Sequence, residues 1–152
     1  MNDLEHRFTE ESVGRSLAVL GERWTLLIVR EAFFGVRRYG QFARNLGIPR
    51  PTLSARLKSL VELGVLERVA YATGPDRHEY RLSAAGRELF PALVVLMRWG
   101  DEHLPLPEGP PLVLRHAPCG EPVEPWLVCH RCGAEITTAN VTPEPGPGHR
   151  EG

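Results

Sequence analysis

The residues best suited to chemistry stand near the C-terminus, in two short motifs of the same spacing. The first is His116-x-x-Cys119, the second is Cys129-x-x-Cys132, and a glycine follows each. Two ligands at this spacing can reach one metal ion, and the glycine permits the positive φ that turns backbone N–H groups toward the thiolates. One imidazole and three thiolates would complete a tetrahedral shell with no open position. The motifs therefore predict a structural Zn²⁺ site and not a catalytic one.

Other interpretations of these residues stay open. A loose tail with free thiols needs no metal, and a Cys-x-x-Cys pair of depressed pKa can form a reversible disulfide. His130 is a rival fourth ligand, although its position between two cysteines suits it less than His116. A segment of roughly 25 residues has too little core to fold unaided, which favours the metal. The segment resembles a zinc ribbon, and the nine residues between Cys119 and Cys129 are enough for a short hairpin.

The composition changes near residue 105 and so divides the chain. Ten of the 14 prolines and all three cysteines lie from Pro105 onward. We therefore expect four parts: a larger domain at 1–104, a Pro-rich linker at 105–112, the zinc-ribbon-like β module at 113–138 and a disordered tail at 139–152.

Hydrophobic periodicity predicts the elements of the larger domain, which is mainly helical with one small hairpin. In chain order these are helices over about 13–20, 24–35, 39–46 and 51–63, strands over 65–71 and 78–82, and a long helix over 84–104. Gly47 ends the third helix, and Pro91 predicts a kink or a restart in the last one. Two helical faces are apolar: Val13, Leu17 and Leu20 in the first helix, and Leu53, Leu57, Leu60 and Val61 in the fourth.

Two short helices around a glycine turn, followed by a hairpin, have the order of a winged helix-turn-helix, an α+β fold. The second helix can enter the major groove of DNA, and the hairpin can reach the adjacent backbone or minor groove. Residues 35–82 carry nine basic and four acidic side chains, a net charge of +5, whereas residues 1–34 sum to −2 and residues 83–152 to −4. This local charge predicts double-stranded DNA as the partner. The candidate contacts are Arg38, Arg50, Thr52, Ser54, Ala55, Arg56, Lys58 and Arg77.

The candidate contacts have different expected partners. Arg56 can reach a guanine or a phosphate, and Lys58 a phosphate. Arg50 stands at a helix N-terminus, which itself favours phosphate. Arg77, at the hairpin tip, is suited to the DNA backbone or the minor groove, and Arg38 to the flanking strand. For each of these residues a solvated surface position is the competing interpretation.

Six motifs of this domain resemble the HxlR branch of the MarR-like winged helix regulators. They are Gly21–Ile28, Gly35 with Arg38-Tyr39, Leu53–Leu57, Glu62–Leu66, His78–Ser83 with Gly86, and Trp99-Gly100. The resemblance covers about residues 11–104. It implies a homodimer, joined through the first and last helices, that binds a pseudo-palindromic operator and represses or activates nearby genes. Many members of this family carry an oxidant-sensing cysteine at the start of the first helix, where this chain has Ser12, so thiol sensing by that route is not expected.

Several classes of protein are excluded. No apolar run approaches the roughly 20 residues of a membrane span, and the polar, acidic start is unlike a signal peptide. An odd number of cysteines indicates the reducing cytoplasm. The chain has no glycine-rich phosphate loop, nucleophile elbow or carboxylate-rich metal motif, so it is not expected to be an enzyme. We expect a sequence-specific regulator of transcription, homodimeric and responsive to a small-molecule effector. The alternative is a winged helix and zinc ribbon adaptor that binds proteins without operator specificity.

Overall fold

The computed structural model describes residues 11–72 and 77–148, and the chain divides into two units between Leu93 and Val94. The boundary lies inside the last helix, earlier than the boundary predicted after residue 104. Leu93 packs into the core of the first unit. The helix beyond it instead lines a cavity together with residues between 110 and 125.

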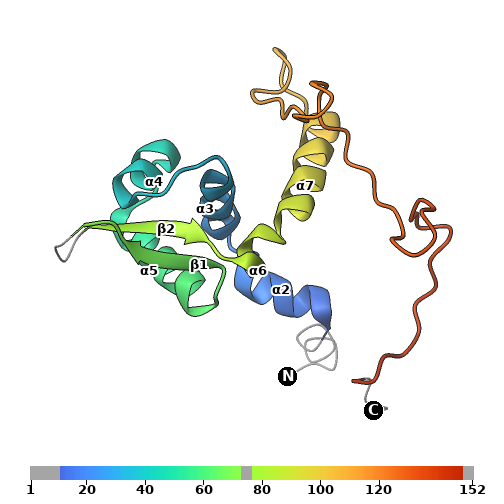
Figure 1. Cartoon of the computed structure of the whole chain (residues 1–152), viewed down its shortest axis with the longest axis horizontal. Helices are drawn as coiled ribbons and strands as arrows, with labels where there is room; N and C mark the ends of the chain where they lie inside the picture. The colour runs from blue at the N-terminus through green and yellow to red at the C-terminus, as the bar shows by residue number, and fades with distance from the viewer. Residues whose placement is uncertain (1–10, 73–76, 149–152) are drawn as a thin grey trace. The chain divides into compact units, whose positions relative to one another are not determined.

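The first unit is mainly helical with one antiparallel hairpin, as the periodicity predicted (Figure 1). Its elements are α2 (Ser12–Leu20), α3 (Arg23–Phe33), α4 (Tyr39–Leu46), α5 (Arg50–Glu62), β1 (Leu66–Ala70), β2 (His78–Leu82) and α6 (Ala84–Arg87). The last helix, α7 (Phe90–His103), starts here and continues into the second unit. The predicted restart is confirmed, because α6 ends at Arg87 and Pro91 lies in the first turn of α7, where proline is tolerated.

Local signals explain where these helices begin and end. Glu22 caps α3 by accepting a hydrogen bond from Trp24 N at 3.1 Å. Gly47 has a φ of 60° and ends α4 in the left-handed conformation that glycine adopts without strain. Pro51 lies in the first turn of α5, where its missing N–H costs nothing. Ser83 caps α6, with its hydroxyl accepting from Gly86 N at 3.0 Å.

The core lies between α3, α4, α5 and β1. Leu53, Leu57 and Leu60 of α5 are fully buried, as the predicted stripe requires, and its fourth residue, Val61, is partly buried against the same core. They pack with Ile28 and Val29 of α3, Phe42 of α4 and Leu66 of β1. The apolar face predicted for α2 behaves differently, because Val13 and Leu17 are 60% and 56% exposed and no residue of α2 is buried.

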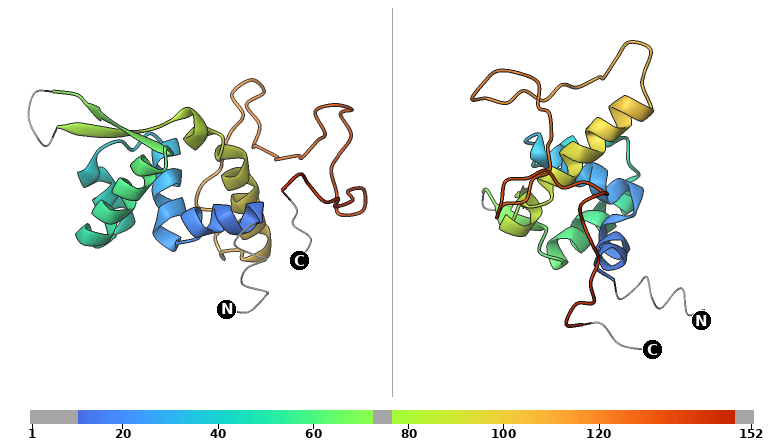
Figure 2. Two further views of the ribbon diagram at one scale, coloured as in Figure 1. Left: turned by 90° about the horizontal axis from the view of Figure 1, so that it is seen from below. Right: turned by 90° about the vertical axis from the view of Figure 1, so that its right-hand side faces the viewer.

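The hairpin forms the wing of the first unit. Its register pairs Leu66 with Leu82 and Ala70 with His78. Figures 1 and 2 show the strands alongside the helices, with β2 contacting α3 and β1 contacting α5. The predicted turn at 73–76 lies outside the described residues.

Among the glycines of this unit, Gly86 lies closest to neighbouring backbone. A Cβ atom there would collide with Val65 O and lie 3.1 Å from Leu82 Cδ2. We expect Gly86→Ala to lower the free energy of unfolding by about 1–3 kcal/mol, the usual cost of overpacking. Urea unfolding measures this change. Gly100→Ala in α7 is the matched control, because nothing lies within 4 Å of its Cβ position. Equal stability of the two variants would contradict the proposed collision.

The second unit combines most of α7 with two short hairpins. Isolated bridges pair Arg115 with Pro122 and Val128 with Glu135. The hairpin predicted between Cys119 and Cys129 is therefore wrong: each hairpin is centred on one of the two motifs, and the residues between the motifs do not pair with one another. Among the described residues, none of the helices combines the length and the hydrophobicity of a membrane span.

Candidate nucleic-acid interface

The helix-turn-helix consists of α4, a turn around Gly47, and α5. Tyr39 fastens the two helices together: its hydroxyl donates to Arg50 O at 3.0 Å and lies 3.1 Å from Ser54 Oγ. Ile48, which follows Gly47 in the turn, is buried in the core. The start of α5 is thereby held in place on α4, which is what a helix that reads base edges requires.

The solvent side of α5 carries most of the predicted contacts. Arg50, Ser54, Ala55 and Lys58 are exposed, and Thr52 is half-buried. Small side chains near the start of the helix would let its backbone approach a groove floor. Lys58 is 77% exposed, and its Nζ lies 3.8 Å from Glu62 Oε1, so it keeps most of its freedom to meet a phosphate.

Arg56 is placed differently from the other candidates on this helix. Its Nε lies 3.2 Å from Glu22 Oε2, and the side chain is 37% exposed. The Nε atom is buried and has no hydrogen-bond partner of good geometry in the described residues. Glu22 is the residue that caps α3. Arg56 therefore joins the start of α3 to the middle of α5, and it has to leave or share Glu22 to contact DNA.

A charged network stands where α4 begins beside the wing. Arg38 Nε lies 3.8 Å from Glu79 Oε1, and its guanidinium lies over the Tyr71 ring at 4.7 Å from the centroid. Arg81 donates to Glu79 Oε2 at 2.9 Å. This hydrogen bond, with the charges of Arg81, Arg37 and Arg38, holds the pKa of Glu79 below its ordinary value. The carboxylate therefore orients several arginines near one edge of the wing.

Arg77 is exposed on the wing, next to the predicted tip. Its carbonyl accepts from Tyr71 N at 3.0 Å, which closes the described part of the hairpin. One strand earlier, Arg68 Nη2 lies 3.3 Å from His78 Nδ1 across the hairpin. The wing therefore presents Arg68 on β1 and Arg77 directly before β2.

Arg68 was not among the residues predicted to contact DNA. It lines a groove of about 460 Å³ between α5 and the wing. The groove is formed by Tyr39, Ser54, Lys58, Val61, Glu62, Arg68 and Tyr80. The sequence shows that Arg68 alternates with Glu67 along the predicted strand. Only the folded hairpin places Arg68 opposite Lys58.

The second candidate site, in the C-terminal unit, is present as two halves. His116 Nδ1 lies 3.4 Å from Cys119 Sγ. The Cys129 sulfur accepts from the backbone N–H groups of Cys132 and Arg131 and from the Cys132 thiol, which holds the pKa of Cys129 below its ordinary value. Within residues 11–72 and 77–148, no three His, Cys, Asp or Glu side chains gather closely enough to hold one metal ion. The structure brings each pair together but not the two pairs.

Known proteins resemble this chain over most of its length. An uncharacterised HTH-type transcriptional regulator of Mycobacterium tuberculosis is 69% identical over 150 residues, which cover 99% of this chain and 95% of the relative. One of Synechocystis sp. is 39% identical over 87 residues, 57% of this chain and 64% of the relative.

Solved structures resemble it as well. The crystal structure of the proposed transcription factor PA1607 has a TM-score of 0.80 and 35% identity, over 92% of this chain and 98% of that one. The redox regulator HypR, in its reduced form, has a TM-score of 0.57 and 28% identity, over 60% of this chain and 92% of that one.

The family model described as HxlR-like helix-turn-helix matches residues 19–108. That match and the names of the relatives are those of transcriptional regulators and not of enzymes, as the sequence predicted. The chain belongs to the HxlR-like helix-turn-helix family of DNA-binding transcriptional regulators.

Proposed function

We propose that this regulator acts as a homodimer that binds a pseudo-palindromic operator in double-stranded DNA. The observation that carries the proposal is the exposed face of α5, where Arg50, Ser54, Ala55 and Lys58 stand clear of the core. This face would enter the major groove, with its small side chains against base edges and Lys58 at a phosphate.

The wing extends the same surface. Arg77 and Arg68 would contact the DNA backbone or the minor groove beside the operator half-site. Arg38, held by Glu79 and Tyr71, would clamp the flanking strand from the start of α4. Half-buried Thr52 would contact the groove near the start of α5. The net charge of +5 over residues 35–82 supports an affinity that falls steeply with salt.

The dimer is supported by apolar side chains that stay exposed among the described residues. On α2, Val13 and Leu17 are each more than half exposed. On α7, Val95, Leu96 and Trp99 are also more than half exposed. A second copy of the chain would bury these faces, and the two-fold symmetry of such a dimer would match two inverted half-sites.

The response to a small-molecule effector is supported by a cavity in the first unit. The cavity measures about 380 Å³ and is lined by Ser12, Arg15, Ser16, Val19, Leu20, Leu63, Val65, Ala85 and Leu89. The lining combines polar and cationic side chains (Ser12, Arg15 and Ser16) with apolar ones, which suits an amphipathic, anionic molecule. Ser12 is at the start of α2, accepting from Arg15 Nη2 at 3.2 Å, and cannot form a disulfide.

The operator proposal is tested by fluorescence anisotropy of the full chain on the DNA upstream of its own gene. Random DNA of equal length is the control, and both probes are measured at two salt concentrations. We expect binding to the upstream DNA to be about 10³-fold tighter or better, with a steep salt slope. Equal weak binding to both DNAs, repeated with fragments selected from the whole genome, would favour the adaptor without operator specificity.

Arg56 provides a sharper test of base readout. We expect Arg56→Ala to lower operator affinity by about 1–3 kcal/mol and to relax the preference at one base pair, because a guanidinium that contacts a guanine discriminates strongly. Glu22→Gln is the matched variant, because it removes the ion pair but keeps an oxygen to cap α3. Glu22→Gln should leave the base preference unchanged. If Arg56→Ala changes only the free energy of unfolding, Arg56 serves the fold and not the readout.

A further inference from the structure

We propose that residues 113–138 fold around one structural zinc ion, held by His116, Cys119, Cys129 and Cys132 after the two hairpins of this segment close on each other. The site goes beyond the DNA-binding function, and its test does not depend on an operator.

The two hairpins are copies of one structure. Each has three backbone hydrogen bonds in the same relative positions, at a constant offset of 13 residues. In the first hairpin the N···O distances are 2.9 Å for His116–Glu121, 2.7 Å for Gly120–His116 and 2.8 Å for Val123–Leu114. In the second they are 2.8 Å for Cys129–Ala134, 2.7 Å for Gly133–Cys129 and 2.9 Å for Ile136–Leu127. A repeat of this kind, with a ligand at each equivalent position, is what a two-knuckle zinc site requires.

Each hairpin already shapes its own pair of ligands. Gly120 and Gly133 have φ values of 75° and 72°, so both turns end in the left-handed conformation. A positive φ at this place in the turn lets backbone N–H groups point toward a thiolate. Such N–H donors are the outer shell that orients a metal-bound thiolate. The donor set, three sulfurs and one imidazole, suits Zn²⁺ in tetrahedral geometry.

The segment has too little buried surface to form a core of its own. No residue from 113 to 138 is buried. Val113, Trp126, Leu127 and Val128 are all about half exposed or more, so apolar surface is available that closure of the hairpins would cover. A unit this small needs a metal or another cross-link to compensate for its missing core.

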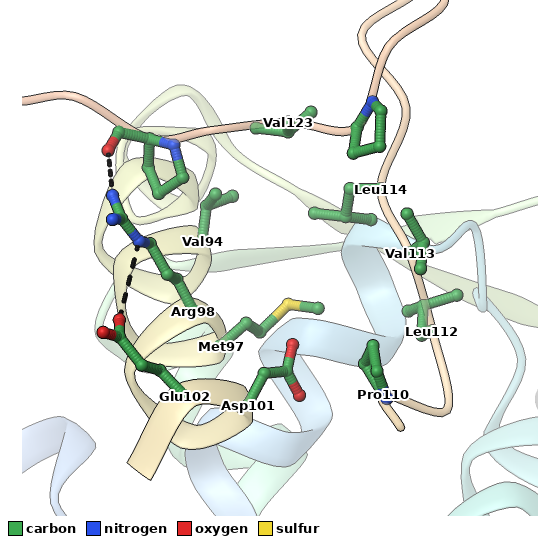
Figure 3. A pocket seen from close by; sticks show the side chains of 12 residues that line it. Val94, Met97, Arg98, Asp101, Glu102, Pro110, Leu112, Val113, Leu114 and Val123 are labelled. Carbon is green, nitrogen blue, oxygen red and sulfur yellow. Dashed lines mark hydrogen bonds and ion pairs between the residues drawn. The ribbon is translucent and has the colours of Figure 1, made fainter. Parts of the chain in front are cut away.

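Side-chain contacts hold the first hairpin on α7, and a short connection joins it to the second hairpin. Figure 3 shows Leu114 and Val123, the outermost hydrogen-bonded residues of the first hairpin, facing Val94 and Met97. These four residues line a cavity of about 470 Å³. Arg98 Nη1 donates to Pro125 O at 3.1 Å (Figure 3), which holds the chain just after that hairpin. Residues 124–126 make no backbone–backbone hydrogen bond within the described chain. Closure of the site requires rotation of the backbone after Pro125, which would bring the second pair of ligands to the first.

The proposal is tested on the full chain, purified from zinc-supplemented medium without a metal-binding tag. Elemental analysis should give about one zinc per chain, as a single four-ligand site requires. The three thiols should resist a thiol reagent until a chelator is added. Cobalt substitution should give the visible spectrum of a tetrahedral, thiolate-rich site. Absence of zinc, with three freely reactive thiols, would overturn the proposal.

Variants identify the ligands. Cys132→Ser and His116→Ala should lose the zinc and make residues 113–138 sensitive to protease, while the circular dichroism and unfolding of the winged helix domain stay as in the parent. His130→Ala is the matched control, because this histidine lies between the two cysteines of the second hairpin and should not affect zinc content. Zinc kept by His116→Ala but lost by His130→Ala would overturn the proposed ligand set.

Discussion

Alanine in place of Phe42 is expected to lower the free energy of unfolding of the winged helix domain by about 3–5 kcal/mol, the usual cost of removing a buried phenylalanine. Phe42 is fully buried, and its ring meets that of Tyr80 edge-on with centroids 6.5 Å apart. It therefore packs α4 against the wing as well as against the core. Domains are typically stable by only about 5–15 kcal/mol, so the variant would lose a large share of its stability.

Urea unfolding followed by circular dichroism measures this loss, with an unchanged denaturant slope as the sign that both end states are the same. Phe34→Ala is the matched control, because Phe34 stands at the end of α3 and is 41% exposed. We expect the control to cost about 1 kcal/mol or less, as for substitutions near the surface. Similar losses for the two variants would show that Phe42 does not join α4 to the wing as described.

The elements of this domain could be predicted because local signals and the core agree. The stripe of Leu53, Leu57 and Leu60 has helical spacing, and the same residues are buried. Gly47 and Ser83 mark helix ends by chemistry that acts within a few residues. Where a signal is local and the fold satisfies it, the sequence is enough.

The side-chain partners in the DNA interface could not be predicted in this way. Arg56 and Glu22, which pair across two helices, are more than 30 residues apart in the sequence. The position of Arg68 opposite Lys58 depends on how the hairpin lies on α5. Periodicity says which face of a helix is polar, but it does not say which of the polar side chains pair with one another.

Apolar patterns have a similar limit. The spacing of Val13 and Leu17 on α2 is as regular as that of the buried stripe on α5, yet both side chains are exposed. A helical apolar face predicts burial, but not whether the same chain or a second copy covers it. The two ligand motifs have a limit of another kind. Their spacing predicted which residues pair as ligands, but only the backbone hydrogen bonds of the structure show that one hairpin is centred on each motif.

Glutamate in place of Leu17 is expected to separate the proposed homodimer. Leu17 is 56% exposed on a helix with no buried residue, beside Val13 at 60%. In a two-fold interface the same patch meets itself or its neighbour, so one substitution places two new carboxylates at the interface. Sedimentation velocity should show a dimer for the parent and a monomer for Leu17→Glu at the same concentration.

Loss of the dimer should weaken DNA binding only where one DNA molecule carries two half-sites. A dimer binds the second half-site intramolecularly, which raises affinity by about 10²–10⁴, and Leu17→Glu should lose this factor on the full operator. On DNA with a single half-site the two proteins should bind equally, since α5 is unchanged. Ala18→Glu is the matched control, because it adds the same charge to an exposed position off the apolar stripe. A Leu17→Glu protein that stays dimeric would show that α2 is not part of the interface. If Leu17→Glu also bound a single half-site weakly, the substitution would have damaged the fold and not the dimer.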